Sequence, residues 1–262
     1  MQVPIKPGTP LSAGTAWRHV LLLLVVIGSL ALVFTMQPIA QDQAYHNFGD
    51  RRAYFGIANF FDVMSNLPFL FVGVAGLRFC LWHRSAGFMP AWFAFFAGVA
   101  MVSAGSGYYH LNPGNETLFW DRLPMTIALM GLFAALIAEY VNARLGRYIL
   151  LPALLTGLSS VLYWQWSGDL RLYVWVQFFP LLTIPILMSL FRTGYSRQRL
   201  ILVALAFYML AKLLEAYDRE IFAFTHGLLS GHSLKHLLAA LGCLSLLVML
   251  RTRVLINPAR YS

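Results

Sequence analysis

Eight apolar runs follow one another along the 262-residue chain, separated by charged residues or by Pro/Gly turns. A helix needs roughly 20 apolar residues to cross the hydrocarbon core of a bilayer, and a backbone in lipid must satisfy its own hydrogen bonds. The runs therefore predict an all-α, polytopic membrane helix bundle. Its eight helices are expected at residues 18–36, 59–81, 89–110, 122–142, 147–166, 171–191, 199–217 and 233–251.

The composition and charge agree with a membrane protein. The chain is 59% hydrophobic and only 11% charged, whereas a soluble domain is about 25% charged, so no large extramembrane domain is expected. The net charge of +9 does not predict a nucleic-acid partner, because the basic residues form no long run. Most of the 19 basic residues fall on one side of the predicted topology, which the positive-inside rule identifies as cytoplasmic, with both termini there.

The acidic residues divide the other way, since all except Glu139 gather toward the non-cytoplasmic face. Arg outnumbers Lys strongly, which suggests a GC-rich bacterial genome. The expected location is therefore a bacterial inner membrane, with the acidic face toward the periplasm.

Three histidines on the acidic face have the relationship that a metal requires. His232 and His236 are four residues apart at the start of the last helix, which places both imidazoles on one helix face. Alone, this spacing is a weak signal, more typical of satisfied or interfacial histidines than of a metal site. His110 ends the third predicted helix at the same membrane depth, however, and three His with a water form a catalytic zinc sphere. Zinc is favoured over copper or iron because no Cys or Met accompanies the triad.

Two further polar residues lie close to His110 in the sequence. Ser106 precedes it by one helical turn, and Asp121 follows after a polar turn, just before the helix expected to begin at Arg122. Ser106 could simply bond back to its own helix, and Asp121 could be an N-cap. Beside a metal, Asp121 could instead act as general base and then acid, and Ser106 as a donor to the oxyanion. Together with the triad, these residues predict a hydrolase centre.

Polar residues on two other helices allow structural and functional interpretations. Asp62 and Ser65, at the outer end of the second helix, could orient a ligand imidazole or could be ordinary helix-terminal groups. Lys212 and Glu215 are three apart in the seventh helix, and an ion pair between them is expected because a buried charge in a membrane must be paired.

These residues carry a resemblance to a known family. The set S106-x3-H110, D121 and H232-x3-H236, with the segment FFDVMSNLPF at 60–69, resembles the alkaline ceramidases. It is also similar to the wider superfamily of seven-helix hydrolases that includes the adiponectin-receptor-like proteins. The resemblance covers roughly residues 42–250. The domains it implies are an N-terminal transmembrane helix and outer polar loop at 1–58, a seven-helix catalytic core at 59–251, and a cytoplasmic tail at 252–262.

The resemblance also implies an activity. It assigns His110, His232 and His236 as zinc ligands, and Asp121 and Ser106 as catalytic groups. The function expected is an integral-membrane, zinc-dependent amide hydrolase that cleaves the N-acyl bond of ceramide or a related membrane lipid, giving a free fatty acid and a sphingoid-type amine. No protein partner is implied. The alternative is a lipid-responsive receptor or sensor with a structural zinc site, which would not require the Asp or the Ser.

One departure from the family pattern concerns calcium. Eukaryotic alkaline ceramidases carry an acidic calcium-binding cluster before and at the start of the first core helix. An alignment on Ser65-Asn66 leaves only Asp50 and Asn59 as oxygen ligands at matching positions. Calcium dependence is therefore doubtful, because most of the acidic cluster is missing.

Overall fold

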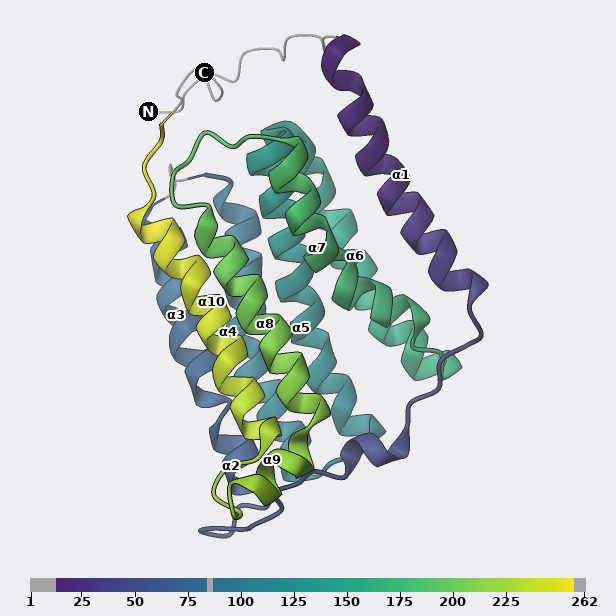
Figure 1. Ribbon diagram of the computed structural model, residues 1–262, viewed down its shortest axis with the longest axis vertical. Coiled ribbons are helices and arrows are strands. Elements are labelled where there is room, and N and C mark those ends of the chain that lie inside the picture. The colour runs from purple at the N-terminus through teal and green to yellow at the C-terminus, as the bar shows by residue number, and fades with distance from the viewer. Residues whose placement is uncertain (1–12, 84–86, 257–262) are drawn as a thin grey trace.

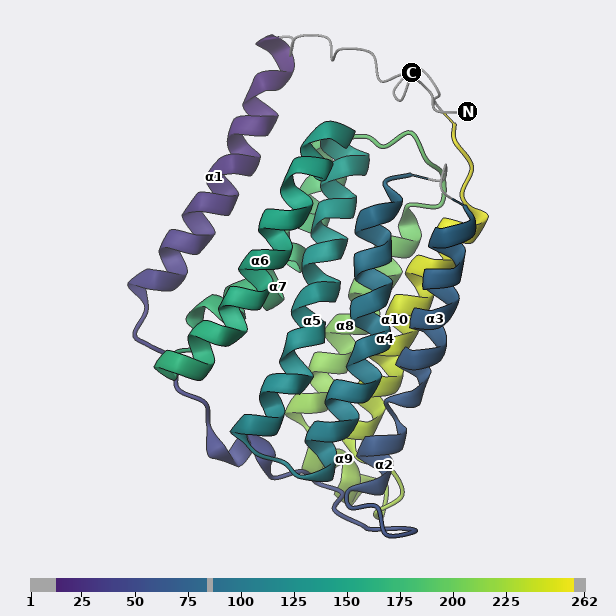
Figure 2. The same cartoon turned by 180° about the vertical axis from the view of Figure 1, so that it is seen from behind.

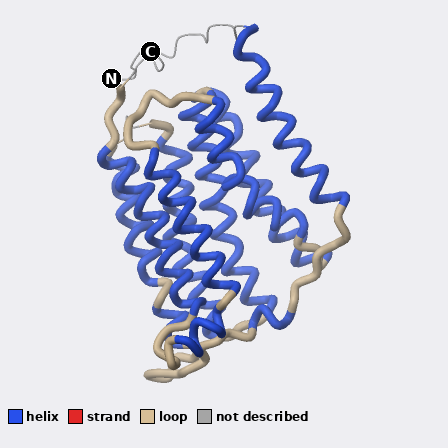
Figure 3. The backbone as a smooth tube through the Cα atoms, viewed as in Figure 1, coloured by secondary structure: helices blue, strands red, loops and turns tan. Residues whose placement is uncertain are grey.

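The computed structural model describes residues 13–83 and 87–256, and this part of the chain forms helices joined by loops, with no strand (Figures 1 and 3). The elements in chain order are α1 (Ala13–Thr35), the 3-10 turn η1 (Gln43–His46), α2 (Phe60–Met64), α3 (Leu67–Trp82), α4 (Met89–Leu111), α5 (Asn115–Leu136), the π-helical turn η2 (Ile137–Val141), α6 (Ala143–Ser167), α7 (Arg171–Leu190), α8 (Arg199–Ala216), α9 (Asp218–Phe224) and α10 (Gly231–Thr252).

The helices have the dimensions of a membrane bundle. Among the described residues, seven spans are long and apolar enough to cross a membrane, or eight if α8 and α9 count as one bent span. The axis turns by 79° between α8 and α9. The predicted all-α, polytopic helix bundle is thus confirmed, and α8 lies where the seventh helix was expected.

Helix α1 stands apart from the other helices. It begins at the same end of the molecule at which α10 ends, runs outside the bundle and reaches it mainly through α7 (Figures 1 and 2). Specific contacts join the two helices: the Trp175 indole N–H donates to Ser29 Oγ at 3.0 Å, and the Arg171 guanidinium donates to the backbone oxygen of Phe34 at 3.2 Å. Helix α1 is therefore an N-terminal helix that lies outside the core of the bundle.

The second predicted helix is broken in the structure. Residues 59–81 were expected to form one helix, but α2 ends at Met64 and α3 begins at Leu67, with Ser65 and Asn66 between them. Pro68 stands in the first turn of α3, where the absence of its N–H is tolerated, whereas inside a continuous helix it would remove a hydrogen bond. The break leaves Ser65 and Asn66 between the two helices, with both side chains buried.

The predicted start of the fourth helix was wrong. Helix α5 begins at Asn115, after Gly114, and not at Arg122. Asp121 is therefore not an N-cap but lies inside the helix, and Glu116 occupies the first turn, where a negative charge is favourable. The polar residues of this first turn had the composition of a loop, which moved the predicted boundary.

A buried ion pair lies at the end of the bundle where α10 ends. Arg253, just beyond α10, donates to both carboxylate oxygens of Glu139 at 2.7 and 2.8 Å, and the Trp92 indole donates to the same carboxylate at 2.7 Å. Arg253 belongs to the predicted tail at 252–262, of which residues 257–262 lie outside the described part of the chain, as do residues 1–12 at the other terminus.

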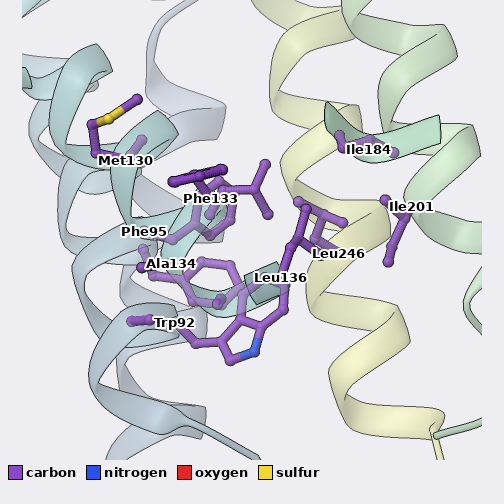
Figure 4. Packing of buried hydrophobic residues seen from close by; sticks show 14 of the residues in the cluster. Trp92, Phe95, Met130, Phe133, Ala134, Leu136, Ile184, Ile201 and Leu246 are labelled. Atoms are coloured by element: carbon purple, nitrogen blue, oxygen red, sulfur yellow. The ribbon is translucent and has the colours of Figure 1, made fainter. Parts of the chain in front are cut away.

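Large apolar side chains fill the centre of the bundle. Figure 4 shows Trp92 and Phe95 of α4 close to Phe133 of α5, with Ile201 and Leu246 contributed by α8 and α10. Lipid tails are as apolar as the helix side chains, so the hydrophobic effect does little to drive helices together in a membrane. Close packing through small residues is therefore needed as well. Gly98 supplies it between α4 and α5, where a Cβ would lie 2.4 Å from the Ala128 nitrogen.

We expect Gly105→Ala to destabilise the bundle. A Cβ at this position would lie 2.1 Å from the backbone oxygen of Trp120, so the two helices would have to separate. The expected cost is about 1–3 kcal/mol of unfolding free energy, measured as a lower thermal midpoint in detergent. Gly107→Ala is the matched control, because its Cβ would meet nothing within 4 Å and Ala favours the helix. Equal midpoints for the two variants would contradict this account of the packing.

Candidate metal centre

The structure brings the three predicted histidines together at one end of the bundle. His110 lies in the last turn of α4, and His232 and His236 lie in the first two turns of α10. Their exposed fractions are 1%, 3% and 5%, and one ligand atom from each lies within 4.8 Å of the others. Helix α10 begins here because the Ser230 side chain caps it, accepting a hydrogen bond from the Ser233 N–H.

The spacing of the imidazole nitrogens suits a metal ion. The Nε2 atoms of His110 and His232 are 3.3 Å apart. Two nitrogens bound to one tetrahedral zinc at 2.0–2.1 Å would be separated by about 3.3 Å. The buried Nδ1 of His110 has no hydrogen-bond partner among the described residues. The three histidines therefore form a group that could hold a metal ion.

Hydrogen bonds at Ser65 determine which nitrogen of His236 faces the other two imidazoles. The Ser65 hydroxyl lies 3.0 Å from the Asp62 carbonyl oxygen and 2.8 Å from His236 Nδ1. The carbonyl can only accept, so the hydroxyl donates to it and accepts the N–H of Nδ1. His236 Nε2 is then left with its lone pair, which is the arrangement that a metal ligand requires.

Asp62 connects the break between α2 and α3 to the start of α10. Its Oδ1 accepts hydrogen bonds from Ser233 at 2.7 Å and Ser230 at 3.3 Å, while its backbone oxygen accepts from Asn66. No hydrogen bond between the Asp62 side chain and an imidazole occurs in the described residues. Its contacts hold the first turn of α10, which carries His232, in place.

We expect Ser65→Ala to weaken metal binding by about 10- to 100-fold, the usual effect of removing a partner that orients a ligand. The variant leaves Nδ1 of His236 without its acceptor, so the ring is free to turn. Competition with a chelator, followed by the metal content per chain, measures the loss. Ser245→Ala is the control, because this half-buried serine of α10 lies away from the triad and donates to the backbone oxygen of Leu241. Unchanged affinity in Ser65→Ala would show that the hydroxyl does not orient His236.

Asp121 and Ser106 face each other across the contact between α4 and α5. Ser106 lies one turn before His110, Asp121 lies in the second turn of α5, and the Ser106 hydroxyl lies near the Asp121 carboxylate. Both side chains are buried, and both line the same cavity as His236. Asp121 is not part of the group of potential metal ligands. A carboxylate beside the imidazoles but outside their ligand set is placed to exchange a proton with a molecule in the cavity.

The expected ion pair between Lys212 and Glu215 is present and extends to a third residue. Lys235, between the two histidines of α10, donates to Glu215 Oε1 at 2.5 Å, and Tyr45 of η1 donates to the same oxygen at 3.1 Å. Burial, followed by the negative charges of Glu215 and Asp121, raises the pKa of the Tyr45 phenol well above its usual value. Tyr45 therefore remains a hydrogen-bond donor.

The polar loop before α2 covers the histidines. The Phe48 ring packs on the rings of His110 and His232, with centroids 4.7 and 4.5 Å away. Asp218, at the start of α9, accepts from the backbone N–H of Gly49 at 2.7 Å and from that of His232 at 2.7 Å. One carboxylate thus joins the loop to α10, and the aromatic ring shields the imidazoles from solvent.

The two residues suggested as calcium ligands have other partners. The Asp50 carboxylate is buried and binds the guanidinium of Arg52 through two hydrogen bonds of 2.9 and 2.7 Å. The Asn59 amide donates to the backbone oxygen of His110 at 2.7 Å. Among the described residues, three or more His, Cys, Asp or Glu side chains lie close enough to share an ion only at the histidine triad. No further acidic side chain among the described residues combines with Asp50 and Asn59 to form a calcium site.

A cavity of about 260 Å³ leads from the site into the bundle. Its polar end is lined by Asp121, His236 and Lys235, and its far end by Leu246 of α10 and Ile201 of α8. Lys235 and Leu246 are 11 residues apart on one helix, which corresponds to about 16 Å at 1.5 Å per residue. A cavity of this volume and length is narrow, and most of its lining is apolar.

Several residues at the polar end were not assigned to the site from the sequence. Lys235 stands between the two histidines in HSLKH, and Arg122 directly follows Asp121. A charged residue inside a membrane helix is a functional candidate by default, so this signal was present in the sequence. The contributions of Tyr45 and Phe48 had no comparable signal, because they depend on how the loop folds back over the bundle.

Comparison of the chain with models of known protein families, with curated proteins and with solved structures gave no match. The interpretation of the site therefore depends on the residues and geometry of this chain alone.

Proposed function

We propose that this protein is an integral-membrane, zinc-dependent amide hydrolase that cleaves the N-acyl bond of a ceramide-like lipid. One observation carries the proposal: the buried triad of His110, His232 and His236 adjoins Asp121 and Ser106 at the polar end of a long apolar cavity. A metal site that served structure alone would need neither the carboxylate nor the hydroxyl.

Three imidazoles without a thiolate or a full carboxylate set favour zinc among the available metals, and these three residues would hold it. Zinc held there would supply a Lewis acid and would lower the pKa of a water molecule toward about 7. The bond between Ser65 and His236 supports this fit, because it keeps the Nε2 lone pair available to the ion.

The neighbouring side chains take the proton-transfer and charge-stabilising roles. Asp121 accepts the proton of the attacking water as general base and then gives it to the departing amine nitrogen as general acid. Ser106 lies near Asp121 and can donate to the oxygen of the scissile carbonyl as negative charge develops on it. Phe48, packed on two of the imidazoles, keeps bulk water away from these steps.

The shape of the cavity supports a substrate with a long acyl chain. An extended hydrocarbon fits a narrow, mostly apolar space of about 16 Å better than a compact ligand does. With the chain between α8 and α10, the amide would lie beside Asp121 at the polar end. We further propose that this end faces the periplasm of a bacterial inner membrane, as the distribution of basic and acidic residues favours.

The experiment that tests the proposal measures zinc and turnover on the same sample. Protein purified in detergent should contain about one zinc per chain and should release fatty acid from ceramide. Stripping the metal with a chelator should abolish release, and added zinc should restore it. Zinc-loaded protein that turns over no N-acyl lipid would contradict the hydrolase proposal and would favour a lipid-responsive sensor with a structural metal.

A further inference from the structure

Arg122 is a buried cation without an acidic partner. Its exposed fraction is 6%, it lines the cavity beside Asp121, and it takes part in no ion pair among the described residues. Its Nη2 donates to Gln41 Oε1 at 2.5 Å, but its buried Nη1 has no hydrogen-bond partner within the described part of the chain. A buried guanidinium normally has all its donors satisfied, because an unpaired charge away from water is costly.

Aromatic rings surround the guanidinium without satisfying these donors. Its Cζ lies 4.2 Å from the centroid of the Trp164 ring and 4.6 Å from that of Tyr173. Such contacts stabilise the positive charge through the ring faces, but the N–H groups point outward in the plane of the guanidinium. The rings therefore hold the side chain in one orientation and leave Nη1 available to an acceptor.

The charges lining the cavity do not balance. Three are cationic, on Lys212, Lys235 and Arg122, and two are acidic, on Glu215 and Asp121. Both lysines bind Glu215, and the Asp121 carboxylate forms no ion pair with Arg122 among the described residues. The positive charge that remains is that of Arg122, at the same depth as the proposed general base.

We propose that Arg122 binds an anionic head group, a carboxylate or a phosphate, on the N-acyl lipid substrate. The proposal rests on the amide hydrolase function proposed above and specifies its substrate class. Arg122 directly follows Asp121 in α5 and both side chains line the same cavity, so one lipid could present its amide to Asp121 and an anion to Arg122. A guanidinium is well suited to either anion, because its N–H groups match their oxygen geometry.

Two matched lipid pairs test the subsite in the zinc-loaded, full-length protein. N-oleoylglycine is compared with N-oleoylethanolamine, and ceramide 1-phosphate with ceramide. Binding is measured as the Kd in the Asp121→Asn background, and fatty acid release is measured in the parent. The anionic lipid of at least one pair should bind about 10- to 100-fold more tightly, the effect of one charge-assisted hydrogen bond. The pair with the larger preference identifies the anion as carboxylate or phosphate.

The variants separate a binding role from a structural one. Arg122→Gln should remove the preference for the anionic lipid while neutral lipids bind as before, and Arg122→Lys should retain part of it. Arg171→Gln is the matched control, because Arg171 pairs with Asp169 and does not line the cavity. It should keep the preference. Equal affinities within both pairs, or a preference that survives in Arg122→Gln, would overturn the subsite.

The two readouts also separate this proposal from the hydrolase proposal. Fatty acid release without any anionic preference would overturn the subsite and leave the hydrolase function standing. An anionic preference in binding, lost in Arg122→Gln, without any fatty acid release would support the subsite and overturn the hydrolase function.

Discussion

Replacing His110 with Asn should remove the bound metal and, with it, measurable amide hydrolysis. The triad has three imidazoles and no fourth protein ligand in its group, so losing one leaves two ligands, too few for a stable zinc site. Zinc should fall from about one ion per chain to nearly none, and turnover by at least about 10³-fold. Metal analysis of the purified variant and fatty acid release measure the two effects.

Asn is chosen over Ala because His110 is fully buried and a smaller side chain would leave a cavity. The thermal midpoint in the presence of chelator shows whether the fold is intact apart from the metal. His83→Asn is the control, since His83 lies at the opposite end of the bundle and stacks on Phe79. His236→Asn should behave like His110→Asn. Full zinc occupancy in either triad variant would show that the metal binds elsewhere.

The ligand positions could be predicted because they follow from helix geometry. The four-residue spacing of His232 and His236 places both on one helix face wherever that helix lies. The number of spans between the two helices was then enough to predict that His110 lies on the same side of the membrane as this pair. The apolar runs defined these spans clearly, because each helix must cross the full hydrocarbon thickness.

The environment of Asp121 could not be predicted in the same way. The residues from Asn115 to Trp120 read as a loop, yet they form the first turns of α5 because α4 packs against them through Gly105. The break at Ser65 was also missed, although it provides the hydroxyl that contacts His236. Both outcomes depend on contacts between helices, which overrule local sequence preference.

The partners of Arg122 and Glu215 could not be predicted from the sequence, because they lie far away along the chain. Arg122 bonds Gln41, 81 positions away, and Tyr45 bonds Glu215, 170 positions away. No local pattern relates such residues. The charge of Arg122 marked it as unusual in a membrane helix, but its lack of an acidic partner became visible only when the surrounding helices were in place.

Asp121→Asn should nearly abolish hydrolysis while leaving the metal bound. Asn has the shape of Asp and can still accept a hydrogen bond from Ser106, but it cannot take up the proton of the attacking water. General acid–base catalysis contributes about 10²–10⁴-fold, so turnover should fall by that factor. Zinc content should match the parent, because Asp121 lies outside the ligand group. Turnover of ceramide and metal analysis on one preparation measure both.

Asp169→Asn is the control for Asp121→Asn. It shows whether an effect comes from losing the catalytic proton acceptor or from losing any buried negative charge. Asp169 is buried but does not line the cavity. Burial would raise the pKa of its carboxyl, but hydrogen bonds from Arg171 and Ile39 outweigh this and lower it to about 2. The substitution should therefore reduce stability and spare turnover. Parent-level turnover in Asp121→Asn would exclude Asp121 as the base, and loss of zinc in that variant would make Asp121 a metal ligand instead. Retained zinc with lost turnover is the result expected of a hydrolase that uses Asp121 as its base and does not bind the metal through it.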